Sequence, residues 1–254
     1  YLYSNIKVTD MTYMFARCSS ITSLDLTSLD TSEVTSMRGM FDNCSDLTNL
    51  DLTPLDTQNV TNMSGMFNSC ESLTSLDLSP LNTKNVTDMS WIFSSCVGLS
   101  SIDLSPLDTN NVTDTSFMFY GCTGLKTLDL TPMNTSKVVT MQQMFYDCSG
   151  LTSLDLTSLD TRNVMGMSGM FQGCKSLINL DLSSLNTQKV TSMNSMFLDC
   201  DSLSTLSIGE KFAFVGTYYN LPSDTWYSSN GTAYISNGNS CTIPSDKADT
   251  YTRK

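Results

Sequence analysis

The sequence predicts an α/β fold, a solenoid of about eight 26-residue coils, each with a short parallel strand and a short helix. Cysteine returns every 26 residues from Cys18 to Cys200, and no insertion breaks this interval. Within each unit, apolar residues change from alternate spacing to helical spacing. The pattern ends after Ile208, where an aromatic-rich segment begins. A fixed period of this length is typical of stacked units that bury their apolar faces only against their neighbours.

Two regions follow from where the repeat ends. The solenoid is predicted to occupy residues 1–208, and a small β-rich cap is predicted to occupy residues 209–254. The chain opens with YLYSNIKVTDMTYMFARC, which corresponds to the second half of a repeat. We therefore expect the array to start partway through a unit of a longer precursor.

The first half of each unit predicts the strand. In the stretch LDLTPLDT, Leu50 and Leu52 point to one side of an extended chain and Asp51 points to the other. Stacked in parallel, such strands would form one long sheet with a buried apolar face and an exposed acidic face. The Asp56-Thr57 step supplies a turn, because short polar side chains bond to the backbone just ahead of them.

The second half of each unit predicts the helix. The stretch VTNMSGMFNSC, residues 60–70, has apolar residues at positions 60, 63, 66, 67 and 70. This spacing marks one face of a helix of about two turns. The recurring methionines indicate core packing and not a copper-binding tract, because Ile92 and Thr115 replace them in two units.

The repeat also has a family resemblance. The runs IDLSPLDTNNVTD, from Ile102, and VTNMSGMFNSC resemble the 26-residue repeat of BspA-like bacterial leucine-rich surface proteins, which is also found in Listeria and Mycoplasma surface lipoproteins. The resemblance covers nearly all of residues 1–208. It implies a leucine-rich-repeat solenoid in a secreted or cell-surface bacterial protein. Members of the family are taken to be adhesins and interaction proteins, and the resemblance implies no enzyme activity.

The composition argues against several classes of partner. Acidic residues outnumber basic ones by 25 to 13, which gives a net charge of −12 and a pI near 4.1. Nucleic acids and anionic membranes are bound through clusters of Lys and Arg, so neither is expected here. No apolar run is long enough to insert this segment into a bilayer. The chain has no His, which excludes a Cys–His catalytic pair.

The recurring cysteines are predicted to be buried thiols. Each one ends the apolar face of a unit, where a small side chain packs well. Metal sites and redox pairs use residues that lie close together in the sequence, whereas these cysteines lie 26 residues apart. Stacking brings equivalent cysteines within disulfide distance, but their side chains point in parallel, so we favour free thiols over disulfides. Cys241 lies outside the series and is the candidate for a free, reactive thiol.

Aspartate is the polar residue with a fixed place on the predicted exposed strand face. We call this series the Asp ladder and predict that it binds a partner: Asp25, Asp51, Asp77, Asp103, Asp129, Asp155 and Asp181. Carboxylates about 4.8 Å apart repel by roughly 1 kcal/mol in a water-like dielectric. Hydrogen bonds from nearby Ser and Thr hydroxyls are the expected remedy, with retained protons or weakly bound Ca²⁺ as alternatives. No cleft sets two carboxylates apart in pKa, so we expect no catalytic residues.

The cap segment is rich in aromatic residues. Asn230-Gly231 predicts a hairpin with a two-residue loop, because both residues tolerate a positive φ. Terminal units of a solenoid cover its last apolar layer, so we expect the aromatic side chains to be buried. The alternative is a carbohydrate platform built on Trp226 and Tyr234, which requires both side chains to be exposed.

These observations predict a secreted or cell-surface module for binding and adhesion. We expect it to be monomeric and to need no cofactor. Its predicted partners are host matrix proteins or other cell-surface proteins, which it binds through the strand face. An acidic face favours a basic or cation-bridged protein partner and binding that weakens as salt rises. Two alternatives stay open. One is a structural spacer of a larger surface protein, which the uniformity of the repeat favours, and the other is carbohydrate binding through the cap.

Overall fold

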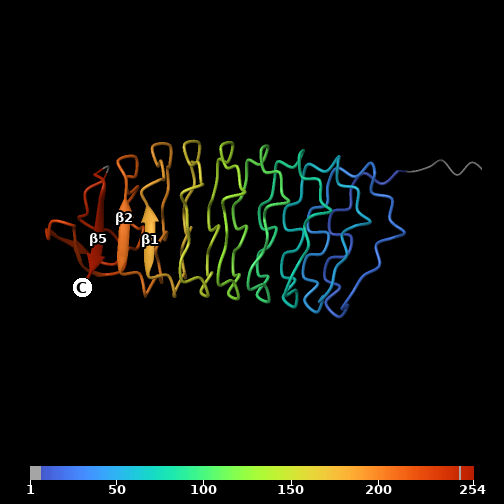
Figure 1. Cartoon of the computed structure of the whole chain (residues 1–254), viewed down its shortest axis with the longest axis horizontal. Coiled ribbons are helices and arrows are strands. Elements are labelled where there is room, and N and C mark those ends of the chain that lie inside the picture. Colours follow the sequence, from blue (N-terminus) through green and yellow to red (C-terminus); the bar gives the residue numbers. More distant parts are fainter. Residues whose placement is uncertain (1–6, 246) are drawn as a thin grey trace, which may run out of the picture.

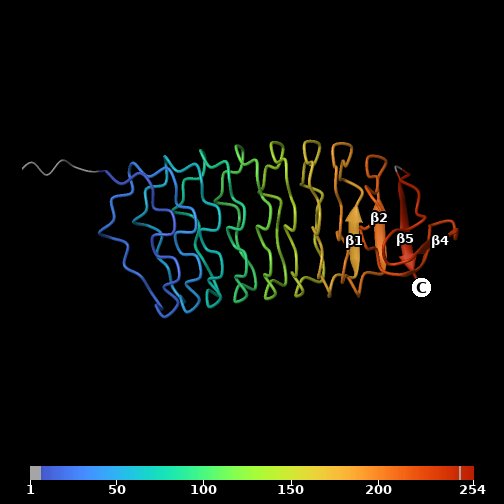
Figure 2. The same cartoon turned by 180° about the vertical axis from the view of Figure 1, so that it is seen from behind.

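The computed structural model describes residues 7–245 and 247–254. The coils stack along one axis and end in the cap (Figure 1), and the view from behind shows the same order (Figure 2). Parallel bridges join one residue of each coil to its equivalents in the neighbouring coils: Asp10, Ser36, Asn62, Asp88, Asp114, Thr140, Gly166 and Ser192. The chain is therefore a repeat solenoid. Residues 1–6 of the predicted array and Asp246 of the predicted cap lie outside the described residues.

The predicted helix is wrong. No α-helix occurs in the described part of the chain, and the stretch in question is a series of tight turns. We call residues 62–69 and their equivalents at 26-residue intervals the turn face. In one such turn, Met66 N–H donates to Met63 C=O at 3.1 Å, and the third residue, Gly65, has a φ of 62°. A positive φ at the third position is what a type II turn requires. No described helix could therefore cross a membrane.

Backbone bonds between coils explain why helical spacing does not produce a helix. Met63, Gly65 and Phe67 donate their N–H groups to carbonyls of the next coil, at 3.1, 2.8 and 3.0 Å. A helix would need these groups for bonds four residues back along the same segment. The three-residue apolar spacing has another origin, since Met63 and Met66, the first and fourth residues of one turn, are both buried in the interior.

Regular strand is confined to the C-terminal end of the molecule, so the predicted continuous sheet is also wrong. β1 (Asn179–Leu182) and β2 (Thr205–Ile208) pair in parallel, and no earlier coil contributes a described strand. The strand face, residues 49–53 and their equivalents, nevertheless keeps its alternation, because Leu50 and Leu52 are buried. The physical reason is that the coils make most of their backbone bonds to one another on the turn face.

The interior consists of apolar columns that run along the stack. One phenylalanine per coil stacks on the next, with ring centroids 5.8–6.2 Å apart: Phe15, Phe41, Phe67, Phe93, Phe119, Phe145, Phe171 and Phe197. Columns of Leu, Met, Val and Cys pack beside these rings. Each inner ring is thus buried between two others, which adds aromatic contact to the burial of apolar area.

A buried threonine in each coil joins it to the next through the side-chain hydroxyl. Thr109 Oγ1 donates to Asn134 C=O at 3.2 Å and accepts a bond from Asn134 N–H at 2.7 Å. The same two bonds are made by Thr31, Thr57, Thr83, Thr135 and Thr161. Buried backbone groups need partners, and these hydroxyls supply them. The Asp-Thr step was predicted as a turn only, without this role between coils.

The cap extends the sheet of the last coils. β5 (Asp249–Arg253) pairs antiparallel with β2, and β3 (Asp224–Tyr227) pairs antiparallel with β5 and with β4 (Ala233–Ser236). The sheet order is β1-β2-β5-β3-β4, and β5 lies beside β2 in Figure 1. The free edge of the last coil is therefore covered by a paired strand.

The predicted hairpin at Asn230-Gly231 is present, but its loop is longer than two residues. Ser228 N–H donates to Thr232 C=O at 3.0 Å, and Gly231 N–H donates to Ser228 C=O at 2.9 Å. Gly231 has a φ of 83°, whereas Asn230 has no positive φ. This is the three-residue loop in which a turn is closed by a glycine in the left-handed region.

Candidate functional site

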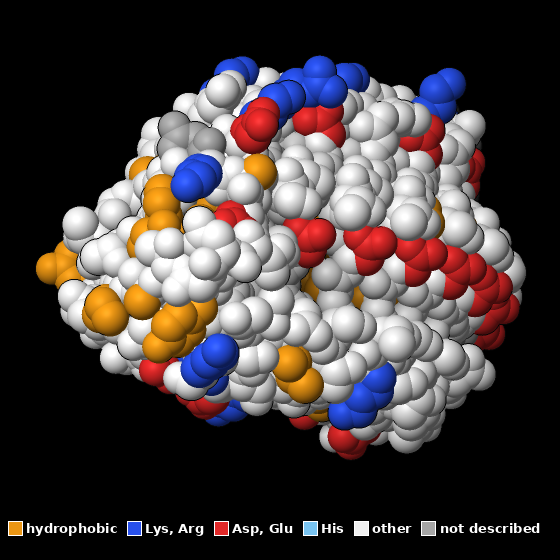
Figure 3. All heavy atoms as spheres, turned by 60° about the vertical axis from the view of Figure 1, so that its left-hand side comes forward, with side chains coloured by type: hydrophobic (Ala, Val, Ile, Leu, Met, Phe, Trp, Pro, Cys, Tyr) orange, Lys and Arg blue, Asp and Glu red, His pale blue; other side chains and the backbone are white. Residues whose placement is uncertain are grey.

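The Asp ladder lies at the surface of the strand face. All seven of its side chains are exposed, and Figure 3 shows a file of acidic side chains along successive coils. Each carboxylate accepts a bond from the backbone N–H two residues ahead, as Asp103 Oδ1 does from Ser105 N–H at 2.9 Å. The second oxygen, Oδ2, accepts no bond from the described residues, so it is free to meet a partner.

Hydrogen bonding, the expected remedy for repulsion within the ladder, operates mainly through the backbone. The N–H of Ser79 is the largest cause of a lowered pKa at Asp77, and repulsion from Asp103 opposes it with a smaller effect. Hydroxyl donors contribute at some positions. At Asp25 the Thr27 hydroxyl donates at 2.7 Å and is the largest cause of the lowered pKa. The sequence predicted hydroxyl donors and missed the backbone N–H that donates to every aspartate of the Asp ladder.

Acid should weaken the solenoid through these carboxylates. Folding lowers the pKa of Asp25, Asp77, Asp103 and Asp155. Their stabilising contribution is thus complete above the ordinary Asp pKa of about 4 and is lost as pH falls through the lower folded-state pKa. We expect the free energy of unfolding in urea to decrease between about pH 5 and about pH 2. A variant with Asn at all four positions keeps an acceptor oxygen that does not titrate, so its free energy of unfolding should decrease less as the pH falls. An equal decrease in the variant would contradict this explanation.

The ladder carries negative charge that ion pairs do not neutralise. The ion pairs of the described residues, Lys7–Glu33 and Arg162–Asp160, do not involve it. Nor do the described Cys, Asp and Glu side chains form any group of three that could hold a metal ion. A cation would therefore meet single exposed carboxylates and no closed site. What the ladder can offer chemically is a row of hydrogen-bond acceptors and a negative potential.

Seven of the eight recurring cysteines are buried free thiols, as predicted, and Cys18 is free but only partly buried. All nine cysteines are free, and those from Cys44 to Cys200 are buried. Each of these seven thiols donates to the carbonyl of the Phe in the preceding coil, as Cys122 Sγ does to Phe93 O at 3.0 Å. Burial raises the pKa of Cys122 to about 12, so the thiolate is strongly disfavoured. A neutral thiol of this kind packs and does not act as a nucleophile or metal ligand.

Cys241 is free, but its surroundings do not activate it. The side chain is half-buried, and Tyr219 Oη lies 3.4 Å from Sγ as a donor. Burial raises the pKa of Cys241, which opposes formation of the reactive thiolate. The sequence identified an unpaired thiol correctly but had no signal for its burial.

Trp226 and Tyr234 do not form the carbohydrate platform that was considered as an alternative. Trp226 is 0% exposed, and its Nε1 donates to Pro222 C=O at 3.2 Å. Tyr234 is partly buried and packs edge-on against Tyr251, with centroids 5.6 Å apart. Stacking on a sugar requires an open ring face. The alternative of sugar binding through these two residues is therefore overturned.

Several exposed or half-buried aromatic residues lie on the turn face, and they were not predicted as site residues. Trp91 stacks on Phe117 at 3.9 Å, and Tyr120 stacks on Tyr146 at 4.4 Å. For Trp91 and Phe117 the available signal was the break in repetition five residues before each cysteine, where the series reads Tyr, Gly, Gly, Trp, Phe, Gln, Gly, Ser. Tyr120 and Tyr146 belong to another variable position, two residues before each cysteine. These positions lie within the stretch for which a helix was predicted, and nothing was concluded from their variation.

One family model matches most of the chain. Residues 9–126 and residues 98–209 match the model of a family described as "Mycoplasma protein of unknown function, DUF285". No curated protein matches the chain significantly.

Solved bacterial leucine-rich repeat proteins are among the similar structures. The T. pallidum protein is 21% identical with a TM-score of 0.48, over 68% of this chain and 73% of that one. The Bacteroides ovatus protein is 20% identical with a TM-score of 0.46, over 81% and 59%. The Eubacterium ventriosum protein is 19% identical with a TM-score of 0.38, over 64% and 39%. This chain thus spans less than two thirds of the last two.

Proposed function

The chain belongs to the DUF285 family, a BspA-like family of bacterial repeat proteins, and from this premise we propose that it is a non-catalytic module that binds a partner protein through the Asp ladder. The observation that carries the proposal is the arrangement of the seven carboxylates. They are all exposed, each is held by a backbone bond, and each keeps Oδ2 open. Solenoids bind partners along such extended faces.

The chemistry of the ladder selects a basic partner. One carboxylate per coil, without ion pairs among the described residues, creates a negative stripe along the stack. Lysine or arginine side chains spaced along an extended segment could each form an ion pair with one aspartate of the Asp ladder. We propose that this segment belongs to a host matrix or other cell-surface protein. A secreted or surface location is part of the proposal and rests on the BspA-like family.

Removing the charge of three rungs tests the proposal without disturbing the fold. Asp77, Asp103 and Asp129 are replaced by Asn, which keeps the acceptor of the backbone bond. Binding to a lysine-rich peptide and to immobilised matrix proteins, measured by surface plasmon resonance, should weaken by about tenfold, because each exposed charge pair contributes roughly 0.2–1 kcal/mol. Reversal of the same three residues to Lys should abolish binding. Affinity should also fall steeply with salt.

The matched control removes the same charge from another column. Asp30, Asp56 and Asp108 lie at a second corner of the coil, where Asn82, Asn134 and Asn186 already stand in other units. Their replacement by Asn should leave binding nearly unchanged. If both triple variants weakened binding equally, the effect of charge would be non-specific, and the binding site would not lie on the Asp ladder. Binding to neither probe would favour a structural spacer.

A further inference from the structure

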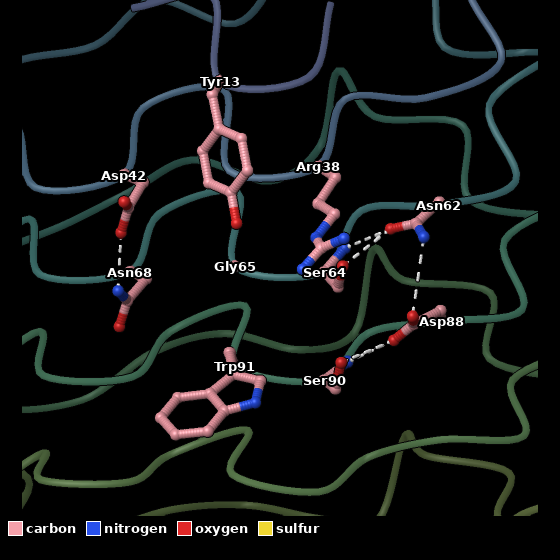
Figure 4. Close-up of a pocket in the computed structure, with 10 residues that line it drawn as sticks. All are labelled: Tyr13, Arg38, Asp42, Asn62, Ser64, Gly65, Asn68, Asp88, Ser90 and Trp91. Carbon is pink, nitrogen blue, oxygen red and sulfur yellow. Dashed lines mark hydrogen bonds between the residues drawn. The ribbon is translucent and has the colours of Figure 1, made fainter. Parts of the chain in front are cut away.

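The turn face carries a pocket in the first coils. Its volume is about 420 Å³, within the roughly 300–1,000 Å³ typical of small-molecule sites. The pocket spans four successive coils, from Tyr13 in the first to Trp91 in the fourth, and Gly65 lies between these two aromatic residues (Figure 4). The turn face is separate from the strand face that bears the Asp ladder.

Of two glycines in this region, Gly65 leaves the hollow open and Gly39 is covered by an aromatic ring. In the series five residues before each cysteine, Gly39 and Gly65 stand between Tyr13 and Trp91. The Tyr13 ring lies directly over Gly39, where a Cβ atom would be 2.2 Å from Tyr13 Cε1. At Gly65 the nearest atoms to an added Cβ are 3.8 and 3.9 Å away, so its position is open. The floor of the pocket is therefore bare backbone between two aromatic side chains.

Trp91 lines this hollow, and its one stacked aromatic partner among the described residues is Phe117. Phe117 of the following coil covers one face of the indole, with centroids 3.9 Å apart and planes within 9° of parallel. Trp91 is 38% exposed and has a φ of 60°. The equivalent residues of the other coils, from Tyr13 to Ser195, have a positive φ as well, so this conformation belongs to the repeated type II turn and is not specific to the pocket.

The pocket holds two amide–carboxylate pairs and two serines; Ser64 Oγ donates to Asn62 Oδ1 at 2.8 Å, and Ser90 Oγ donates to Asp88 Oδ1 at 2.7 Å. Asn68 Nδ2 donates to Asp42 Oδ1 at 2.6 Å, and Asn62 Nδ2 approaches Asp88 Oδ2 at 3.5 Å. The four amide and carboxylate side chains are half-buried, and Figure 4 shows the two pairs on opposite sides of Gly65. Carboxylates accept hydrogen bonds, and amides both donate and accept, so each pair matches adjacent hydroxyl groups.

The charges of the pocket disfavour an anion. Arg38 contributes one positive charge and is engaged with the Tyr13 ring, its guanidinium carbon 5.6 Å from the ring centroid. Asp42 and Asp88 contribute two negative charges. A ligand with one apolar ring face, a rim of hydroxyls and no charge fits aromatic walls and amide–carboxylate pairs together.

We propose that this pocket binds a neutral pyranose unit of an oligosaccharide. The face of Trp91 that Phe117 does not cover packs against the C–H face of the sugar, Tyr13 closes the opposite side, and the two amide–carboxylate pairs bond to its hydroxyls. The site is independent of the protein partner of the Asp ladder. A module with both would bind a glycosylated surface through two separate faces.

Tryptophan fluorescence tests the proposal directly. The chain has two tryptophans, and Trp226 is fully buried, so accessible quenching reports on Trp91. The probes are neutral tetrasaccharides of glucose, mannose, galactose and N-acetylglucosamine, with sialyllactose and a lysine-rich peptide for comparison. At about 10 mM, enough to detect a Kd near 1 mM, at least one neutral sugar should protect Trp91 from acrylamide. Protection by none of them, or only by sialyllactose or the peptide, would overturn the proposal.

Two variants locate the binding. Trp91→Gly uses a residue that the same position already holds in other coils, and Gly65→Gln fills the floor with the side chain that Gln143 carries at its equivalent position. By calorimetry, each should weaken sugar binding by about tenfold or more. The control Gln143→Gly, outside the pocket, should change it less than about twofold. Unchanged affinity in both pocket variants would overturn the site. Asn variants of the Asp ladder should leave sugar binding intact, which separates the two proposals.

Discussion

Replacing Phe119 by alanine is expected to lower the free energy of unfolding by about 3–5 kcal/mol. The side chain is fully buried and stacks between Phe93, at 5.8 Å, and Phe145, at 6.0 Å between ring centroids. Alanine removes contacts on both sides and leaves a cavity. The coils cannot close it readily, because the hydrogen bonds of the turn face hold them at a set separation. The midpoint of urea unfolding, followed by circular dichroism, measures the loss.

Phe117→Ala is the matched control for this variant. It removes the same side chain from the same coil, two residues earlier, where the ring is only half-buried on the turn face. We expect a loss below about 1 kcal/mol. If both variants were equally destabilised, the stacked rings would not be the main support of the central coils.

Replacing Thr109 by valine is expected to cost about 1–3 kcal/mol, although the two side chains have nearly the same shape. The change removes the hydroxyl that accepts from Asn134 N–H at 2.7 Å and donates to Asn134 C=O at 3.2 Å. Thr109 is only 3% exposed, so water cannot readily replace these bonds. Thermal and urea unfolding of the variant, compared at equal protein concentration, give the cost.

Thr113→Val provides the comparison. This hydroxyl also bonds to the preceding coil, donating to Thr87 C=O at 3.1 Å, but it is exposed, and Val139 occupies the equivalent position in the next coil. We expect a change within about 0.5 kcal/mol. A similar cost at both positions would mean that burial of the hydroxyl does not decide its contribution.

The candidate sites were predictable to different degrees. The Asp ladder could be predicted, because a two-residue alternation places Asp51 opposite Leu50 and Leu52 whether or not the strands form a regular ladder. The pocket could not, because it depends on Tyr13 and Trp91 lying three coils apart on one face with Gly65 between them. That arrangement becomes visible only when the turns, and not a helix, set the direction of each side chain.

Sequence alone predicts the 26-residue repeat, the stacking of the coils and the buried columns, because the repeated apolar spacing indicates which side chains face inward. It establishes the free thiols for the same reason, since a cysteine that recurs beside Phe fills the same interior position in every coil. Tertiary structure decides the rest. Whether Met63 N–H bonds within its own segment or to the next coil depends on a neighbour 25 residues away, Asp88, and this choice replaces the helix with turns. The buried Trp226 likewise lies on β3 opposite Arg253 of β5, a pairing between separate segments that local spacing does not encode.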